Sequence, residues 1–306
     1  MTSSGMQSAP AELFRALAVL AEPPVEGHAR VAEALGLTSA PDGATYAELF
    51  LFQLHPYASV YLGAEGMLGG DARDRVAGFW RAVGRTPPAE SDHLSALLGL
   101  YASLLDEAAD AAPPQATLIR RSAAALLHEH LAPWMPLFLE GVRGVARGLY
   151  RDWADLLEAA LRGELRASPA AGALPLHLRV APELPDPRAH GADAFLSGLL
   201  APVRSGILVT RADVAELGRS LGIGVKMGSR RSVLEHLLAE APEAVLGALG
   251  AAAEARARGH GAWSSLLPGV AGFWSRRAEA TARLLQELAV HGGSVEAVDG
   301  VEVTRR

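Results

Sequence analysis

Apolar residues recur at intervals of three and four along the chain, which is the period of a helix with one buried face. The clearest run has its apolar positions at Leu94, Leu97, Leu98, Tyr101, Leu104 and Leu105. The sequence AAPP follows at residues 111–114, and proline ends a helix because it lacks a backbone N–H and clashes with the preceding turn. The pattern therefore predicts a core helix that ends at this AAPP sequence.

A second helical pattern follows Pro133 and Pro136 and predicts one longer apolar face. Its positions are Val142, Val145, Ala146, Leu149, Trp153, Leu156, Leu157 and Ala160. Three glycines occur in the same stretch, at positions 141, 144 and 148. Glycine has no Cβ, so we expect a neighbouring helix to approach closely there.

The helical pattern is lost between residues 168 and 192. Five prolines occur in this stretch, namely Pro169, Pro175, Pro182, Pro185 and Pro187. Such a composition is typical of a linker or of a segment that wraps around a domain.

The helical pattern resumes near Thr210, which forms a capping-box-like start with Asp213. Gly222 and Gly224 mark the end of this helix. Further helices are predicted at about 229–240, 242–257 and 270–290. The last stretch, SVEAVDGVEVT, has two short valine-containing arms around a turn at residues 299–300, which fits either a short hairpin or a frayed tail.

These patterns predict four segments. A helical domain covers residues 1–165, a proline-rich linker covers 166–192, a smaller helical unit covers 193–290, and a tail or short hairpin covers 291–306. The composition agrees with an all-α fold, because the chain is rich in strong helix formers and only 6% aromatic.

The absence of cysteine excludes disulfides, Cys-ligated metal sites and thiol nucleophiles. The N-terminus has no basic region ahead of its first apolar turn, and no window approaches 18 uninterrupted apolar residues. We therefore expect a cytoplasmic protein with no stable membrane insertion.

Charge is divided unevenly along the chain. Residues 1–165 hold 20 acidic and 12 basic residues, a net charge of −8, whereas residues 166–306 hold 14 acidic and 16 basic residues, a net charge of +2. An acidic first domain argues against a nucleic-acid ligand and suits a cationic partner, although a solvated acidic surface explains it equally well.

No motif has the spacing of a known catalytic, metal or cofactor site. His128 and His130 are two residues apart, so on a helix they do not face the same way, as a zinc pair would. The sequence GIGVKMG at 222–228 has the wrong spacing for a dinucleotide site and lacks the Lys-Ser/Thr pair of a P-loop. We interpret it as a turn between helices and expect no catalytic residue, metal or cofactor.

The sequence SRRSVLE at 229–235 is similar to a twin-arginine export motif, but it lies deep in the chain, whereas such signals are N-terminal. Its apolar positions are those of an ordinary core helix. We therefore interpret Arg230 and Arg231 as the solvated start of that helix.

Two segments resemble the TorD/DmsD/NarJ family of chaperones for molybdopterin oxidoreductases. The first is YAELFLFQLHPYASVYL at residues 46–62, followed by ESDHL at 90–94. The second is LLHEHLAPWMPLF at residues 126–138. They occur in the family's order and approximate spacing, and the resemblance covers about residues 45–165. It implies a TorD-like helical bundle and a non-catalytic chaperone.

The resemblance also implies a signal-peptide site. Its residues would be Tyr46, Leu49, Phe50, Pro56, Tyr57, Asp92 and His93. A twin-arginine signal offers cationic side chains and an apolar helical stretch, which require a carboxylate and an apolar groove. Structural roles remain open for the same residues, because apolar positions at helical spacing are usually core and an Asp-His pair that opens a helix is usually a cap.

A second group in the family segments is interpreted as a structural hinge between helical halves. Its members are Glu129, His130, Pro133, Trp134 and Pro136. Proline breaks the helix there, and a neighbouring tryptophan can fix the break by packing. Family members exchange domains, so we hypothesise that a domain-swapped homodimer forms at this hinge.

The function implied by the resemblance is assembly and export proofreading of a molybdopterin oxidoreductase, whose signal peptide and immature catalytic subunit are the expected partners. A NarJ-like chaperone for a client that is not exported is the alternative within this class. Two other classes stay open: a helical enzyme that uses Asp92 and His93 as an acid–base pair, and a helix-turn-helix scaffold within residues 193–290.

Overall fold

The structure, a computed structural model, describes residues 9–168, 173–225 and 228–295. These residues are helical nearly throughout, and the β pairing among them is confined to an isolated antiparallel bridge between Tyr57 and His93. The prediction of an all-α fold is confirmed. None of the described helices combines the length and apolar character needed to cross a bilayer.

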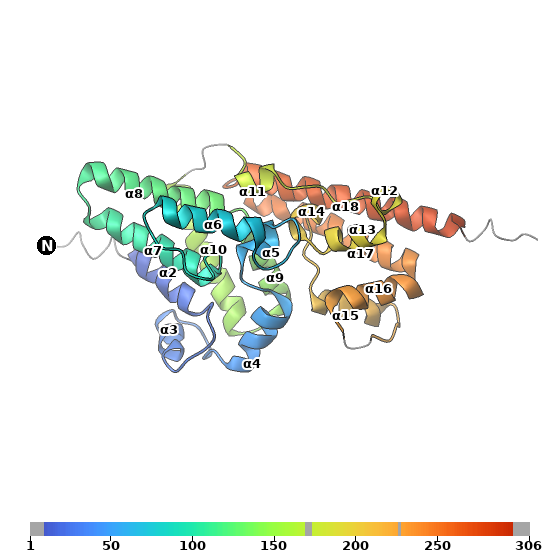
Figure 1. The fold of residues 1–306 in the computed structure, drawn as a ribbon. Coiled ribbons are helices and arrows are strands. Elements are labelled where there is room, and N and C mark those ends of the chain that lie inside the picture. The colour runs from blue at the N-terminus through green and yellow to red at the C-terminus, as the bar shows by residue number, and fades with distance from the viewer. Residues whose placement is uncertain (1–8, 169–172, 226–227, 296–306) are drawn as a thin grey trace, which may run out of the picture.

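The first part of the chain forms the lobe at the left of Figure 1. Its helices, among which η1 and η2 are π-helical, are α2 (Ala9–Val19), α3 (His28–Ala34), α4 (Gly43–Tyr46), η1 (Ala47–Gln53), α5 (Ala58–Leu62), α6 (Gly70–Ala82), α7 (Leu94–Asp110), α8 (Pro113–Ala125), η2 (Leu126–Leu131), α9 (Met135–Val145) and α10 (Leu149–Ala167).

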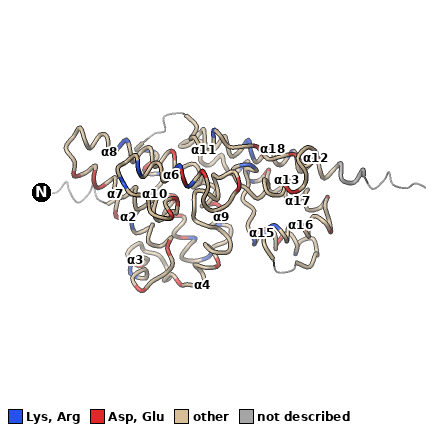
Figure 2. The backbone as a smooth tube through the Cα atoms, in the orientation of Figure 1, with Lys and Arg blue, Asp and Glu red and all other residues tan. Residues whose placement is uncertain are grey.

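The second part lies beside the first, and its long helix α18 extends from the middle of the molecule to the right in Figure 1 and, in the same orientation, in Figure 2. Its elements, of which η3 is a 3-10 turn, are α11 (Leu176–Arg179), α12 (Pro187–His190), α13 (Ala192–Leu199), α14 (Pro202–Ser205), α15 (Arg211–Ser220), α16 (Arg230–Glu240), α17 (Pro242–Gly259), η3 (His260–Trp263) and α18 (Pro268–Val295).

The helices predicted from apolar spacing are confirmed. The run that begins at Leu94 is α7, which ends at Asp110 just before the AAPP sequence. The ranges 229–240, 242–257 and 270–290 correspond to α16, α17 and α18. Thr210 and Asp213 form a complete capping box at the start of α15, in which each side chain accepts a hydrogen bond from the other residue's backbone N–H.

The prediction of one continuous apolar face after Pro136 was wrong. α9 ends at Val145 and α10 begins at Leu149, because the backbone turns at Gly148, whose φ of 56° is costly for any other residue. Close packing occurs at Gly141, where an added Cβ would lie 2.6 Å from a methyl group of Leu208, but not at Gly144.

The segment after α10 is not structureless, since it contains the short helices α11 and α12. Leu178 of α11 is buried in the core of the first lobe. The predicted turn at Asp299–Gly300 lies outside the described residues.

Two buried apolar clusters hold the molecule together. The first is rich in aromatic side chains, among them Phe50, Phe138, Tyr150 and Trp153, which meet mainly edge to face. The second belongs to helices α13 to α18. Helix α18 contributes to both, with Phe273 and Trp274 in the first cluster and Ala278, Ala282 and Leu285 in the second.

The residues predicted to form a hinge are packed against the second part of the chain. The indole Nε1 of Trp274 donates to the backbone oxygen of Pro133 (2.8 Å), and Trp134 donates to the backbone oxygen of His130 (2.8 Å). Glu129 accepts from the backbone N–H of Leu176 (3.1 Å). Pro136 is also buried, in the first turn of α9. The turn between η2 and α9 is therefore bound by α18 on one side and by the segment leading to α11 on the other.

Candidate functional site

The loop between η1 and α5 lies against the start of α7. The backbone N–H of Ala58 donates to the Asp92 backbone oxygen (3.0 Å), and that of Leu94 donates to the Pro56 backbone oxygen (2.8 Å). These bonds flank the bridge between Tyr57 and His93. The structure thus brings together four of the residues that the sequence predicts for the site, although they come from segments more than thirty residues apart.

Asp92 faces the interior of this junction. It is 1% exposed, and its carboxylate accepts a hydrogen bond from the backbone N–H of Ser59 (3.0 Å) in the first turn of α5. A carboxylate at this place satisfies an N–H group that the helix leaves free and interacts favourably with the helix dipole. Asp92 therefore stabilises α5 and does not present its charge to solvent.

His93 is the N-cap of α7. Its Nδ1 accepts from the backbone N–H of Ser95 (3.2 Å), which assigns the ring proton to Nε2 in the neutral form. Burial lowers the pKa of His93, and the nearby carboxylates of Glu90, Glu22 and Asp92 oppose that effect. At neutral pH the ring is an uncharged donor through Nε2.

Tyr57 packs its ring edge-on against His93, with ring centroids 4.7 Å apart. Its hydroxyl donates to the carboxylate of Glu90 (2.8 Å). Burial raises the pKa of Tyr57 well above its usual value, and the hydrogen bond to Glu90 adds to this effect. Tyr57 is thus fixed as a neutral donor that orients Glu90.

A cavity of about 720 Å³ opens beside these residues, and we call it the acidic cavity. Its lining residues are Glu22, Trp80, Arg85, Pro88, Ala89, Glu90, His93, Ser95, Ala96, Gly99, Leu100 and Ser103. Arg85 is already neutralised by Glu107, whereas Glu22 and Glu90 are exposed and form no ion pair within the described part of the chain. The cavity therefore combines two available carboxylates with apolar wall from Trp80 and Leu100.

The other three predicted site residues are core residues. Tyr46 is 5% exposed, Leu49 2% and Phe50 0%, and Phe50 contacts the rings of Tyr46 and Trp153. Burial raises the pKa of Tyr46, with smaller contributions from Glu22 and Glu90, so its hydroxyl stays protonated behind the acidic cavity. None of the three lines this cavity.

The sequence analysis did not identify Glu22 and Glu90 as site residues. Glu90 opens the ESDHL segment, so its position two residues before Asp92 was a usable signal. Glu22 follows α2 and is distant in sequence from every family segment, so only the tertiary structure places it at the cavity.

The arrangement is suited to binding a cation rather than to acid–base chemistry. Asp92 and His93 have separate hydrogen-bond partners, Ser59 and Ser95, and so do not act on one another as a catalytic pair would. The Nε2 of His128 donates to the backbone oxygen of Ser168 (2.6 Å), and the described residues contain no group of three His, Asp or Glu side chains placed to hold a metal ion.

Comparison with protein families gives a match over residues 29–140 to the family described as nitrate reductase delta subunit. The matched region contains η1, the loop at Pro56 and Tyr57, the Asp92–His93 cap and the turn at Trp134. A comparison with curated proteins found no matching relative. The match over residues 29–140 confirms the resemblance of this part of the chain to the NarJ- and TorD-like proteins.

Proposed function

We propose that this protein is a chaperone for the assembly of a molybdopterin oxidoreductase and that it binds the client's twin-arginine signal peptide at the acidic cavity. The family of residues 29–140 supports the chaperone class. The observation that supports the binding site is the presence of two exposed carboxylates, Glu22 and Glu90, that form no ion pair among the described residues and lie beside the neutral His93 donor.

The chemistry of the cavity complements that of the signal. A guanidinium group binds a carboxylate through charge-assisted hydrogen bonds, and Glu90 is already oriented by Tyr57 (2.8 Å). The apolar part of the signal would pack on Trp80 and Leu100, which line the same cavity. Asp92 acts indirectly in this proposal, because it holds α5 and the Tyr57 loop in place.

The proposal is tested by titration calorimetry of the protein with the client's N-terminal peptide and with a version in which both arginines are alanine. Exposed ion pairs contribute about 0.5–1 kcal/mol each, so the Glu22→Gln/Glu90→Gln variant should bind the arginine peptide about five- to thirtyfold more weakly. The alanine peptide should bind the variant and the unchanged protein equally.

The matched control is Glu33→Gln, which removes an exposed carboxylate of α3 that does not line the cavity. A loss of affinity in the control as large as in the double variant would reduce the effect to net charge and contradict the proposed site. Tight binding that does not depend on the arginines would instead favour a NarJ-like chaperone whose client is not exported.

A further inference from the structure

Four exposed apolar side chains line a cavity on the opposite side of η1 from the buried Leu49 and Phe50. They are Leu51 (52% exposed), Phe52 (52%), Met67 (69%) and Leu68 (56%), and the cavity measures about 410 Å³. Neighbouring exposed apolar residues mark interaction sites more often than scattered ones do, because leaving them in water is unfavourable. The second part of the chain completes the wall with Leu208, Arg211 and Arg230.

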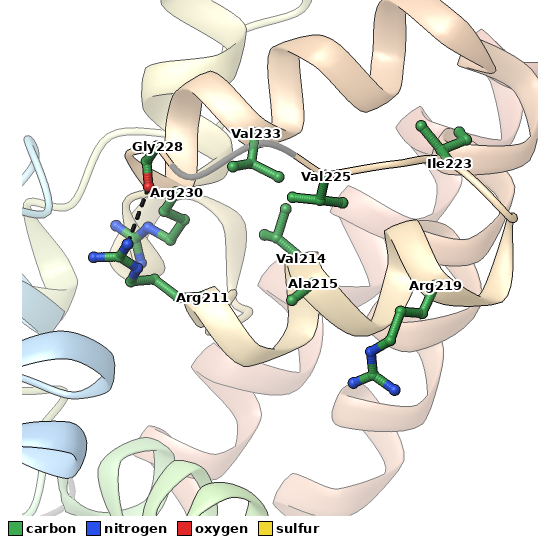
Figure 3. Close-up of a pocket in the computed structure, with 9 residues that line it drawn as sticks. All are labelled: Arg211, Val214, Ala215, Arg219, Ile223, Val225, Gly228, Arg230 and Val233. Atoms are coloured by element: carbon green, nitrogen blue, oxygen red, sulfur yellow. Dashed lines mark hydrogen bonds between the residues drawn. The ribbon is translucent and has the colours of Figure 1, made fainter.

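A second cavity, of about 360 Å³, lies between α15 and α16 (Figure 3). Its centre is apolar, with Val214, Val225 and Val233 pointing toward one another. Arg211 and Arg230 lie together at one end, and Arg219 projects at the other. Because Arg211 and Arg230 line both cavities, the two cavities adjoin at this arginine pair. We call the combined surface the arginine groove.

The two arginines have backbone partners but no acidic partner in the described part of the chain. Arg230 donates to the backbone oxygens of Val209 (2.8 Å) and Leu200 (3.3 Å), and Arg211 donates to that of Gly228 (3.1 Å). Arg219, in contrast, pairs with Glu216.

Arg230 is also partly buried, and burial lowers its pKa. The interpretation of Arg230 as a solvated residue was therefore wrong, whereas Arg231 does pair with Glu235 at the surface.

An incompletely paired guanidinium in a partly buried site is unfavourable, and a carboxylate brought by a ligand would offset this cost. Tyr61 lines the same wall, and its buried hydroxyl makes no hydrogen bond within the described residues. Next to its exposed apolar side chains, the groove therefore has two guanidinium groups without an acidic partner and one hydroxyl without a hydrogen bond among the described residues.

We infer that the arginine groove binds a segment of the immature client subunit in which a carboxylate stands between apolar side chains. The identity of the partner rests on the proposed chaperone function. The groove does not suit the twin-arginine signal, because a cationic peptide would be repelled by Arg211 and Arg230. It would instead cover an acidic, amphipathic helix that the unfinished client has not yet packed.

The inference is tested with two fluorescein-labelled amphipathic helical peptides that carry leucines on one face and differ at one central position of that face, Glu in one and Gln in the other. Fluorescence polarisation should show micromolar binding of the Glu peptide and about tenfold or more weaker binding of the Gln peptide. Arg230→Met should lower the affinity for the Glu peptide toward that for the Gln peptide and leave the Gln peptide unchanged, because the carboxylate loses one of its two guanidinium partners.

Because Arg230 also binds two backbone oxygens, the exposed Arg211 supplies a second variant, Arg211→Gln, with the same expected direction. Phe52→Ser should weaken both peptides several-fold. The matched controls are Arg258→Gln, a paired and exposed arginine of α17 that lines neither cavity, and Leu118→Ser, an exposed leucine of α8, and neither should change binding.

Equal binding of the Glu and Gln peptides, or no binding of either, would overturn the inference. Equal effects of Arg211→Gln and Arg258→Gln would do the same, because they would reduce the effect to net charge. The signal-peptide titration separates this result from a failure of the proposed function, since the groove variants leave Glu22 and Glu90 in place.

Discussion

The acidic cavity and the arginine groove begin from the same short stretch of chain but differ in what completes them. Tyr57, just after η1, reaches the acidic cavity through Glu90, and that cavity is lined entirely by residues that precede α8. Leu51 and Phe52, within η1, line the arginine groove, which also needs α15 and α16. The two surfaces carry opposite charge. The short stretch from η1 to Tyr57 can therefore serve two ligands of different chemistry, provided that the second part of the chain stays packed against the first.

The second part of the chain is held against the first by a few buried contacts. We expect the largest change in stability when one of these contacts is removed. Trp274 is fully buried, packs against Phe273 and donates to the Pro133 backbone oxygen. Trp274→Ala should lower the free energy of unfolding by about 3–5 kcal/mol, because it leaves a cavity and an unpaired carbonyl. Chemical denaturation measures this change.

The same variant distinguishes the two surfaces. Under conditions where it remains folded, Trp274→Ala should weaken binding of the Glu peptide to the arginine groove more than binding of the signal peptide to the acidic cavity. Equal losses at both surfaces would show that the acidic cavity also depends on α18. Trp274→Phe is the control, since it retains most of the ring and loses the hydrogen bond.

Acid should loosen the contact between η2 and α11, which is the next largest effect. His130 and His177 are buried with ring centroids 5.6 Å apart, and burial lowers their pKa values to about 3 and about 4. At pH values between these folded-state pKa values and the unfolded-state pKa of about 6.5, the unfolded chain binds more protons than the folded protein does. Stability is therefore complete above about pH 6.5 and falls as the pH falls toward 4.

Thermal unfolding across this pH range should show the midpoint falling with acid. In His177→Phe the fall should be shallower, because one buried imidazole no longer resists protonation. His190→Phe, at an exposed position in α12, is the control and should keep the original slope. An unchanged slope in His177→Phe would mean that carboxylates, not this pair, determine the acid sensitivity.

The fold could be predicted largely from sequence because helical spacing, proline and capping boxes are local signals. Leu49, Phe50, Leu51 and Phe52 show the limit of such signals. Successive side chains of a helix point in different directions around its axis, so four consecutive apolar positions cannot all face one core. Here the first pair is buried and the second is exposed. Since all four are apolar, their order alone does not say which pair faces inward.

The site residues were harder to predict for a related reason. The structure brings Tyr57, Asp92 and His93 together at one junction, but the accessible carboxylates are Glu22 and Glu90, and Glu22 comes from a separate segment. Arg230 shows the same limit, because its hydrogen-bond acceptors, the backbone oxygens of Val209 and Leu200, lie outside its own helix. Contacts between distant segments leave no periodic trace in the sequence.

A smaller change in stability is expected when the Asp92 carboxylate, which caps the first turn of α5, is removed. Asp92→Ala deprives the Ser59 backbone N–H of its acceptor and should lower the free energy of unfolding by about 1–2 kcal/mol. Glu90→Gln, at an exposed position, should leave stability nearly unchanged and weaken the signal peptide. If Asp92→Ala weakened the peptide without destabilising the protein, Asp92 would contact the ligand directly, as the family resemblance implied.

The smallest expected effect is a difference in how peptide binding at the two surfaces responds to salt. Glu22 and Glu90 are exposed, so raising the ionic strength from about 0.05 to 0.5 M should weaken signal-peptide binding a few-fold, because the Debye length falls below the reach of exposed charges. Binding of the Glu peptide to the arginine groove should change less, since Arg230 is partly buried and apolar contact with Leu51, Phe52, Met67 and Leu68 does not depend on ionic screening. Titrations of both peptides at matched salt concentrations measure the contrast. Equal salt slopes would mean that long-range charge, rather than the local environment of each carboxylate and guanidinium, governs both sites.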